Sequence, residues 1–218
     1  KTLSDCPPYR ISVSLYGATE RSYESVTKTR GSFTMFIKAL ELAREADFNI
    51  RLNIILTKFN EKERESMKSL ANNFGFEYHV YPYLSPTLEG SDQPLSVMAD
   101  CSEEDKNRRS KLSKKESWHD RCLAGRTFFH VDSLGKVSIC KVARTHTIDL
   151  LQEGVEGLKK LGNFADLLLK TPKICLSCAS IGKCSTCPPR LFLYKRSGTI
   201  PHRICHVLDK YTKGGDKK

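Results

Sequence analysis

Apolar and polar residues alternate along three short segments in the first part of the chain. These segments cover residues 9–16, 50–57 and 77–83, and each contains several β-branched or aromatic residues. Such alternation is typical of β-strands. Between the segments, apolar residues recur every three or four positions, which is typical of helices with one buried face. Alternating strands and helices predict βαβ units around a parallel sheet, and therefore an α/β fold.

The predicted helices have recognisable ends. Thr19 is expected to cap a short helix over 20–26, and Ser32 a longer one. Asn60 is expected to cap the helix after the second strand, and Gly75 to end it. The buried faces of the two longer helices are expected to hold Phe33, Phe36, Ile37, Leu40, Leu42 and Ala43 in one, and Met67, Leu70, Ala71 and Phe74 in the other.

The periodic pattern stops at residue 84. Residues 85–121 combine turn-forming residues with a basic stretch, which indicates a linker. This linker is either a solvated helix or a contact surface for an acidic peptide or a phosphate backbone. A hairpin follows, in which 126–131 and 136–140 flank a turn ending in Gly135, and Asn163 is expected to cap a short helix through Leu169. The expected divisions are 1–84, 85–121, 122–206 and a C-terminal tail over 207–218.

Composition narrows the possible classes of protein. No apolar run among the 218 residues approaches the length of ~20 that spans a membrane. The first residues have no signal-peptide pattern, and nine cysteines are an odd number for disulfide pairing. We therefore expect a cytoplasmic protein whose cysteines bind metal. The net charge of +11 suits nucleic acid, acidic peptides or anionic cofactors alike.

The cysteines are concentrated in the second half of the chain. Seven lie between positions 122 and 205, and four of these form two CxxC pairs, Cys175 with Cys178 and Cys184 with Cys187. Thiolates at this spacing converge on one metal, and their softness selects zinc or iron–sulfur clusters. The pairs are too close together to build a core, so a bound metal is expected to supply folding energy.

Together with Gly135, these seven cysteines resemble the SPASM domain, the twin-cluster C-terminal extension of many radical S-adenosylmethionine (radical SAM) enzymes. The order is Cys122, Gly135 and Cys140, then the two CxxC pairs, then Cys205. The family usually places three residues between the last pair, and this chain has two, Ser185 and Thr186.

The resemblance implies two auxiliary 4Fe–4S clusters. The first would be held by Cys122, Cys140 and Cys187. The second would be held by Cys175, Cys178, Cys184 and Cys205. For the first cluster, either His130 or Asp132 completes the site, or one iron stays open for a substrate thiolate.

Residues 1–84 resemble the second half of the partial (β/α) barrel of radical SAM enzymes, in strands four to six. Residues 11–17, 30–33 and 56–60 carry this likeness. It implies that Ser14 and Arg30 contact S-adenosylmethionine. The CxxxCxxC motif of the family, which holds a third 4Fe–4S cluster, is not in these residues, so this chain is expected to be inactive alone.

By resemblance, the complete enzyme is an oxidoreductase-type radical SAM enzyme that modifies a peptide or protein by radical hydrogen abstraction. Its expected partners are that substrate and an electron donor such as a flavodoxin or ferredoxin, with no membrane or nucleic acid. Two alternatives stay open. One is a zinc-binding nucleic-acid module built on the four central cysteines. The other is a scaffold whose clusters serve only structure or electron transfer.

Overall fold

The computed structural model describes residues 2–99, 122–176 and 187–198. They form two compact units, each considered separately. The N-terminal unit contains the residues up to 84 together with 93–99, and the C-terminal unit contains 85–92 and the described residues from 122 onward. Three predicted ligands, Cys178, Cys184 and Cys205, lie outside the described residues, as does the basic stretch of the predicted linker.

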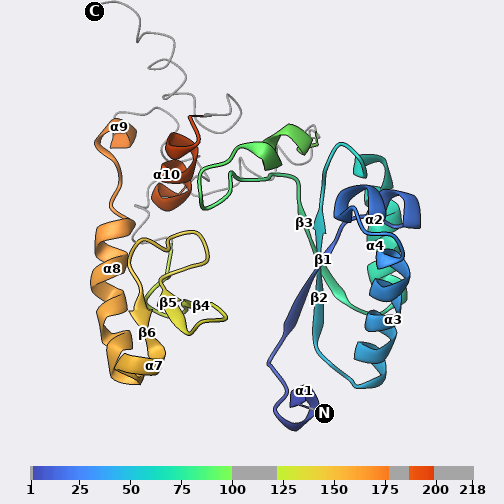
Figure 1. Cartoon of the computed structure of the whole chain (residues 1–218), viewed down its shortest axis with the longest axis horizontal. Helices are drawn as coiled ribbons and strands as arrows, with labels where there is room; N and C mark the ends of the chain where they lie inside the picture. Colours follow the sequence, from blue (N-terminus) through green and yellow to red (C-terminus); the bar gives the residue numbers. More distant parts are fainter. Residues whose placement is uncertain (1, 100–121, 177–186, 199–218) are drawn as a thin grey trace, which may run out of the picture. The chain divides into compact units, whose positions relative to one another are not determined.

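The N-terminal unit is built on a parallel sheet of three strands in the order β1-β2-β3 (Figure 1). The strands are β1 (Ile11–Leu15), β2 (Ile50–Ile55) and β3 (Glu77–Tyr81). Helices α2, α3 and α4 cover one face of this sheet (Figure 1). The helical elements are α1 (Thr2–Asp5), α2 (Glu20–Thr27), α3 (Ser32–Glu45), η1 (Glu61–Glu63), α4 (Arg64–Asn73) and η2 (Gln93–Val97). The predicted α/β class with a parallel sheet is confirmed.

The register of the strands separates an apolar face from a polar face. Leu15 pairs with Ile54, and both side chains are completely buried, as is Leu52. Because successive residues of a strand point to opposite faces, the intervening residues point away from this apolar core. They form two rows across the sheet, Ser12–Arg51–Glu77 and Ser14–Asn53–His79.

The ends of the first helices follow the expected pattern only in part. Thr19 caps α2 through a capping box with Ser22, as predicted. The prediction for Ser32 is wrong, because Gly31, at φ 76°, is the N-cap of α3 and no side chain caps this helix. The hydroxyl of Ser32 instead lies 2.8 Å from that of Thr27. Leu42 was also wrongly placed on the buried face, since it is 65% exposed.

Helix α4 buries Met67 and Ala71, with Leu70 and Phe74 packed against the same core, as expected. Gly75, at φ 73°, ends this helix. Asn60 precedes η1 but makes no capping hydrogen bond, so its predicted role is wrong. Its side chain turns inward instead and is only 1% exposed.

The C-terminal unit contains a small antiparallel sheet made of β4 (His130–Val131), β5 (Lys136–Ser138) and β6 (Ile148–Asp149). The first two strands are the predicted hairpin, with Gly135 at φ 75° in its turn. Helical elements follow: α7 (Leu150–Glu153), η3 (Val155–Lys160), α8 (Leu161–Leu168), α9 (Lys173–Leu176) and α10 (Pro188–Arg196). Asn163 does not cap a helix as predicted, because η3 leads directly into α8 and Asn163 lies within it.

Candidate metal centre and ligand face

Two cysteines of the C-terminal unit, Cys122 and Cys140, lie within electrostatic reach of a third, Cys187. Cys122 precedes the hairpin, Cys140 follows β5, and Cys187 is the residue at which α10 begins. All three are free thiols of intermediate exposure. Burial raises the pKa of the Cys187 thiol, and negative charge on Cys140 and Cys122 adds to this rise, which requires the thiols to be near Cys187. Segments far apart in the sequence therefore bring these thiols into one region.

Burial is the largest cause that raises the pKa of Cys187. The backbone amide and guanidinium of Arg190, in the first turn of α10, act in the opposite direction. A buried thiol of this kind stays protonated without metal, and gives up its proton when a cation binds it. The donor chemistry of the three thiols thus fits a soft metal or an iron–sulfur cluster.

Within the ranges that the structure describes, no three His, Cys, Asp or Glu side chains are grouped closely enough to hold a metal ion. Cys175, expected in the second ligand set, lies in α9, and its three expected companions, Cys178, Cys184 and Cys205, fall outside those ranges. Both ligand sets therefore stay predictions.

His130 and Asp132 differ as candidates for a further ligand of the first set. The Asp132 carboxylate accepts hydrogen bonds from the Lys136 and Leu134 amides, which hold the pKa of Asp132 low and commit it to the turn. In the His130 ring, Nδ1 is buried without a hydrogen-bond partner among the described residues, and Nε2 lies 3.3 Å from Arg144 Nη2. Because a guanidinium only donates hydrogen bonds, ligation through Nδ1 requires Arg144 to release Nε2. The pKa of His130 is lowered by burial and then by the Arg144 guanidinium, so the ring favours the neutral form that binds metals. His130 is therefore the better candidate.

The polar face of the N-terminal sheet carries a second candidate site. Ser14 lies there beside Asn53, whose Oδ1 is buried without a hydrogen-bond partner within the described part of the chain. An unsatisfied buried oxygen costs about 1–3 kcal/mol, so a ligand donor is expected to contact it. His79 follows in the same row and is exposed. The sequence analysis did not select Asn53 or His79, although the alternation in 50–57 and 77–83 assigns both to this face.

Asn60 and Glu63 fix the turn that follows β1. Asn60 Nδ2 donates to the carbonyl oxygens of Tyr16 (2.7 Å) and Ile55 (2.9 Å), and its Oδ1 accepts from the Thr57 amide at 2.7 Å. The Glu63 carboxylate accepts from the backbone amide of Ala18 and from the Ser22 hydroxyl. The carboxyl ends of parallel strands are where ligands bind in barrels and open α/β sheets. These bonds therefore make that end of the sheet rigid.

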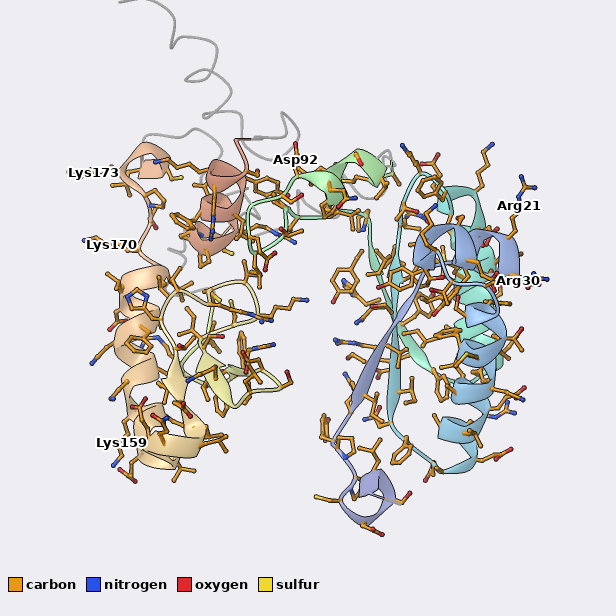
Figure 2. The ribbon with its side chains drawn as sticks, viewed as in Figure 1. Arg21, Arg30, Asp92, Lys159, Lys170 and Lys173 are labelled. Carbon is orange, nitrogen blue, oxygen red and sulfur yellow. The ribbon has the colours of Figure 1, made fainter. Side chains whose placement is uncertain are left out.

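The structure does not bring Arg30 into contact with Ser14. Arg30 is exposed in the turn between α2 and α3, and its side chain projects outward from the helical layer (Figure 2). Ser14 lies on the opposite, polar face of the sheet. Their roles in binding S-adenosylmethionine stay predictions.

No family model matches the chain. Two curated enzymes are similar to parts of it. An AdoMet-dependent heme synthase from Methanosarcina barkeri is 26% identical over 166 residues, which cover 60% of this chain and 47% of that protein. The mycofactocin maturase MftC from Mycolicibacterium smegmatis is 28% identical over 126 residues, which cover 57% of this chain and 31% of that protein.

These similarities confirm the resemblance to radical SAM/SPASM-type enzymes, at partial coverage. The chain spans about half the length of the first relative and about a third of the second. Neither relative supports a zinc-binding nucleic-acid module. None of the described helices combines the length and apolar character needed to cross a membrane.

Proposed function

We propose that this chain forms part of a radical SAM/SPASM enzyme that modifies a peptide or protein substrate by radical hydrogen abstraction. The N-terminal unit is the second half of a partial barrel, and the C-terminal unit is a SPASM lobe with two auxiliary 4Fe–4S clusters. The electrostatic interaction of Cys187 with Cys140 and Cys122 supports this proposal, because the resemblance assigns these three residues to one cluster.

In this proposal, Cys122, Cys140 and Cys187 hold the first cluster, and Cys175, Cys178, Cys184 and Cys205 hold the second. Bound iron–sulfur clusters supply one-electron transfer. The protein contributes thiolates from separate elements, so that binding ties the hairpin to the start of α10 and stabilises a small lobe. His130 is the side chain of this lobe that we assign as a further ligand of the first cluster.

The polar face of the sheet holds S-adenosylmethionine and part of the substrate in this proposal. The Asn53 Oδ1, which has no hydrogen-bond partner among the described residues, accepts a hydrogen bond from a donor of the ligand, and the Ser14 hydroxyl donates to or accepts from a polar group beside it. The Asn60 hydrogen bonds keep the strand ends in place for this contact. The Arg30 guanidinium matches the geometry of the carboxylate of S-adenosylmethionine. For Arg30 to reach this carboxylate, the turn between α2 and α3 has to fold toward the strand ends.

A peptide substrate is favoured because one of the two relatives is named a maturase. A flavodoxin or ferredoxin is the electron donor that we assign by resemblance. The nine cysteines agree with a reducing compartment, and we therefore place the enzyme in the cytoplasm.

The proposal is tested by anaerobic purification of the chain, with iron, sulfide and zinc measured beside the visible spectrum. We expect about eight irons and eight sulfides per chain and a broad absorption band near ~400 nm. One zinc without sulfide, in protein never exposed to oxygen, would reject the cluster assignment. Equilibrium dialysis with S-adenosylmethionine then compares the wild type with Ser14→Ala and Asn53→Ala, with the exposed Asn72→Ala as control. Binding that these two variants leave unchanged would reject the assigned ligand face.

A further inference from the structure

The C-terminal unit contains a cavity of about 500 Å³ that no part of the proposed chemistry uses. Its walls come from the segment after Cys140, the end of α8, helix α10 and the 85–92 loop. Cavities of roughly 300–1,000 Å³ are typical of ligand sites. The size therefore suits one large side chain with its neighbouring backbone.

Most of the lining is apolar, and part of it is exposed. Leu167 and Phe192 line the cavity, although they are 59% and 54% exposed. Leu88 contributes from the loop. Covering such side chains with an apolar partner stabilises a complex by roughly 25 cal/mol per Å² of buried surface.

Two guanidinium groups give the lining a positive charge. Arg144 and Arg196 both line the cavity, and no carboxylate belongs to the described lining. Two carboxylates outside the lining interact with these arginines. The pKa of Glu89 is lowered first by its own backbone amide and by the Thr87 hydroxyl, and then by Arg196 and Arg144. The pKa of Asp132 is lowered first by the Lys136 amide, and Arg144 adds to this effect. Because neither carboxylate is part of the lining, the described walls of the cavity carry only positive charge.

Both arginines are held in place by the fold. Arg196 Nη1 donates to the Leu88 carbonyl oxygen at 3.2 Å. Its stem lies against Gly90, where any side chain would come within 3.0 Å of Arg196 Cγ. Arg144 Nε donates to the Lys141 carbonyl oxygen at 3.0 Å, and its Nη2 lies 3.3 Å from His130 Nε2. Their remaining N–H groups are therefore oriented before a ligand arrives, which lowers the entropy cost of binding.

We propose that this cavity binds an acidic segment of the peptide substrate, with a leucine- or phenylalanine-sized side chain among Leu88, Leu167 and Phe192, and a carboxylate on Arg144 and Arg196. The inference rests on the proposed function, because it assigns a recognition site for that substrate. Val142 and Pro188 also line the cavity, next to the candidate ligands Cys140 and Cys187. The bound segment is thereby held beside the proposed first cluster.

Fluorescence anisotropy on the full 218-residue chain, reconstituted anaerobically with iron and sulfide, tests the proposal. The probe is fluorescein-labelled Gly-Asp-Leu-Asp-Leu-Asp. Two matched probes replace every Asp by Asn, or every Leu by Ser. We expect the first probe to bind at least about fivefold more tightly than either matched probe, since one contact is ionic and the other apolar.

Substitutions then locate the site. Arg144→Gln and Arg196→Gln are each expected to weaken the acidic leucine probe about fivefold or more. Arg196→Lys keeps the charge, so it is expected to recover most of this loss. Phe192→Ser removes an exposed apolar wall and is expected to abolish the advantage of Leu over Ser. Lys170→Gln is the control, because this substitution removes the same charge. Lys170 projects outward beyond the end of α8 (Figure 2).

Equal binding of all three probes, or equal losses in Arg196→Gln and Lys170→Gln, would overturn the proposal, since a diffuse basic surface would then explain the binding. The two proposals fail separately. Protein that contains the expected iron but binds no probe rejects only the cavity. Probe binding that responds to Arg144→Gln in protein without iron rejects only the clusters.

Discussion

Asn60 donates a hydrogen bond through Nδ2 to the carbonyl oxygen of Tyr16, 44 residues earlier in the chain, at 2.7 Å. The same amide group donates to Ile55 and accepts from Thr57. One buried side chain thus joins the residues that follow β1 to those that end β2. Local sequence could not reveal this relationship, because an asparagine before a helix is also a typical capping residue.

Replacing Asn60 by alanine is expected to lower the free energy of unfolding by about 3 kcal/mol, because buried backbone groups lose their partners. Asn60→Asp is expected to cost at least as much, because a carboxylate would face two carbonyl oxygens. Urea denaturation monitored by circular dichroism measures both. The exposed Asn73→Ala serves as control, with an expected change within about 0.5 kcal/mol. An equally small change in Asn60→Ala would show that these hydrogen bonds contribute little.

Gly17 and Gly162 are expected to respond oppositely to alanine. A methyl group at Gly17 would come within 2.5 Å of the Tyr23 amide nitrogen and 2.3 Å of Ser22 Oγ, so the turn before α2 would have to move. We expect a loss of at least about 2 kcal/mol. Gly162 lies in α8 with nothing within 4 Å of a methyl group, so alanine there should stabilise by about 0.5–1 kcal/mol. Thermal unfolding of both variants tests the pair, and a stable Gly17→Ala protein would contradict the tight turn.

Asp149 makes part of the stability of the C-terminal unit dependent on pH. Its hydrogen bond with Lys136, and those from the amides of Gln152 and Leu151, hold the pKa of this carboxyl below its ordinary value of 3.8. The stabilisation is therefore fully present above that value and is lost as the pH falls through the lower pKa of the folded state. We expect Asp149→Asn to be less stable than the wild type at pH 7, with a difference that shrinks in strong acid.

Urea denaturation at several pH values measures this difference. Lys136→Gln removes the ammonium group that donates a hydrogen bond to Asp149, so it should reduce the same pH-dependent contribution. A stability deficit of Asp149→Asn that is constant from neutral to strongly acidic pH would contradict an ionic origin.

The two proposed ligand sets predict separate losses of iron. Cys140→Ser and Cys187→Ser should each reduce the iron content from about eight to about four per chain, and Cys175→Ser should do the same through the other set. Cys6→Ser is the control, since this exposed thiol belongs to neither set. Combining Cys140→Ser with Cys187→Ser should cause no further loss, whereas combining Cys140→Ser with Cys175→Ser should remove nearly all iron. Unchanged iron in Cys187→Ser would remove that residue from the first set.

The sequence predicted the strands, the Thr19 cap and the hairpin, because each depends on residues close together in the chain. The wrong predictions of helix caps lie at positions where the backbone conformation or a residue distant in the sequence determines the structure. At Gly31 the left-handed backbone replaces the expected Ser32 cap. At Asn163 the preceding 3₁₀ turn continues directly into the helix. The ligand set of Cys122, Cys140 and Cys187 comes only from the family resemblance and stays a prediction, since no local pattern relates residues so far apart.

The alternation along β2 has a practical consequence for engineering. Leu52 and Ile54 face the helices, whereas Arg51 and Asn53 face the other way. Substitutions at Leu52 and Ile54 would mainly change thermal stability, and substitutions at Arg51 and Asn53 would mainly change ligand specificity. The two sets of effects should be nearly additive. A single-residue insertion within this strand would exchange the two pairs and abolish both properties at once.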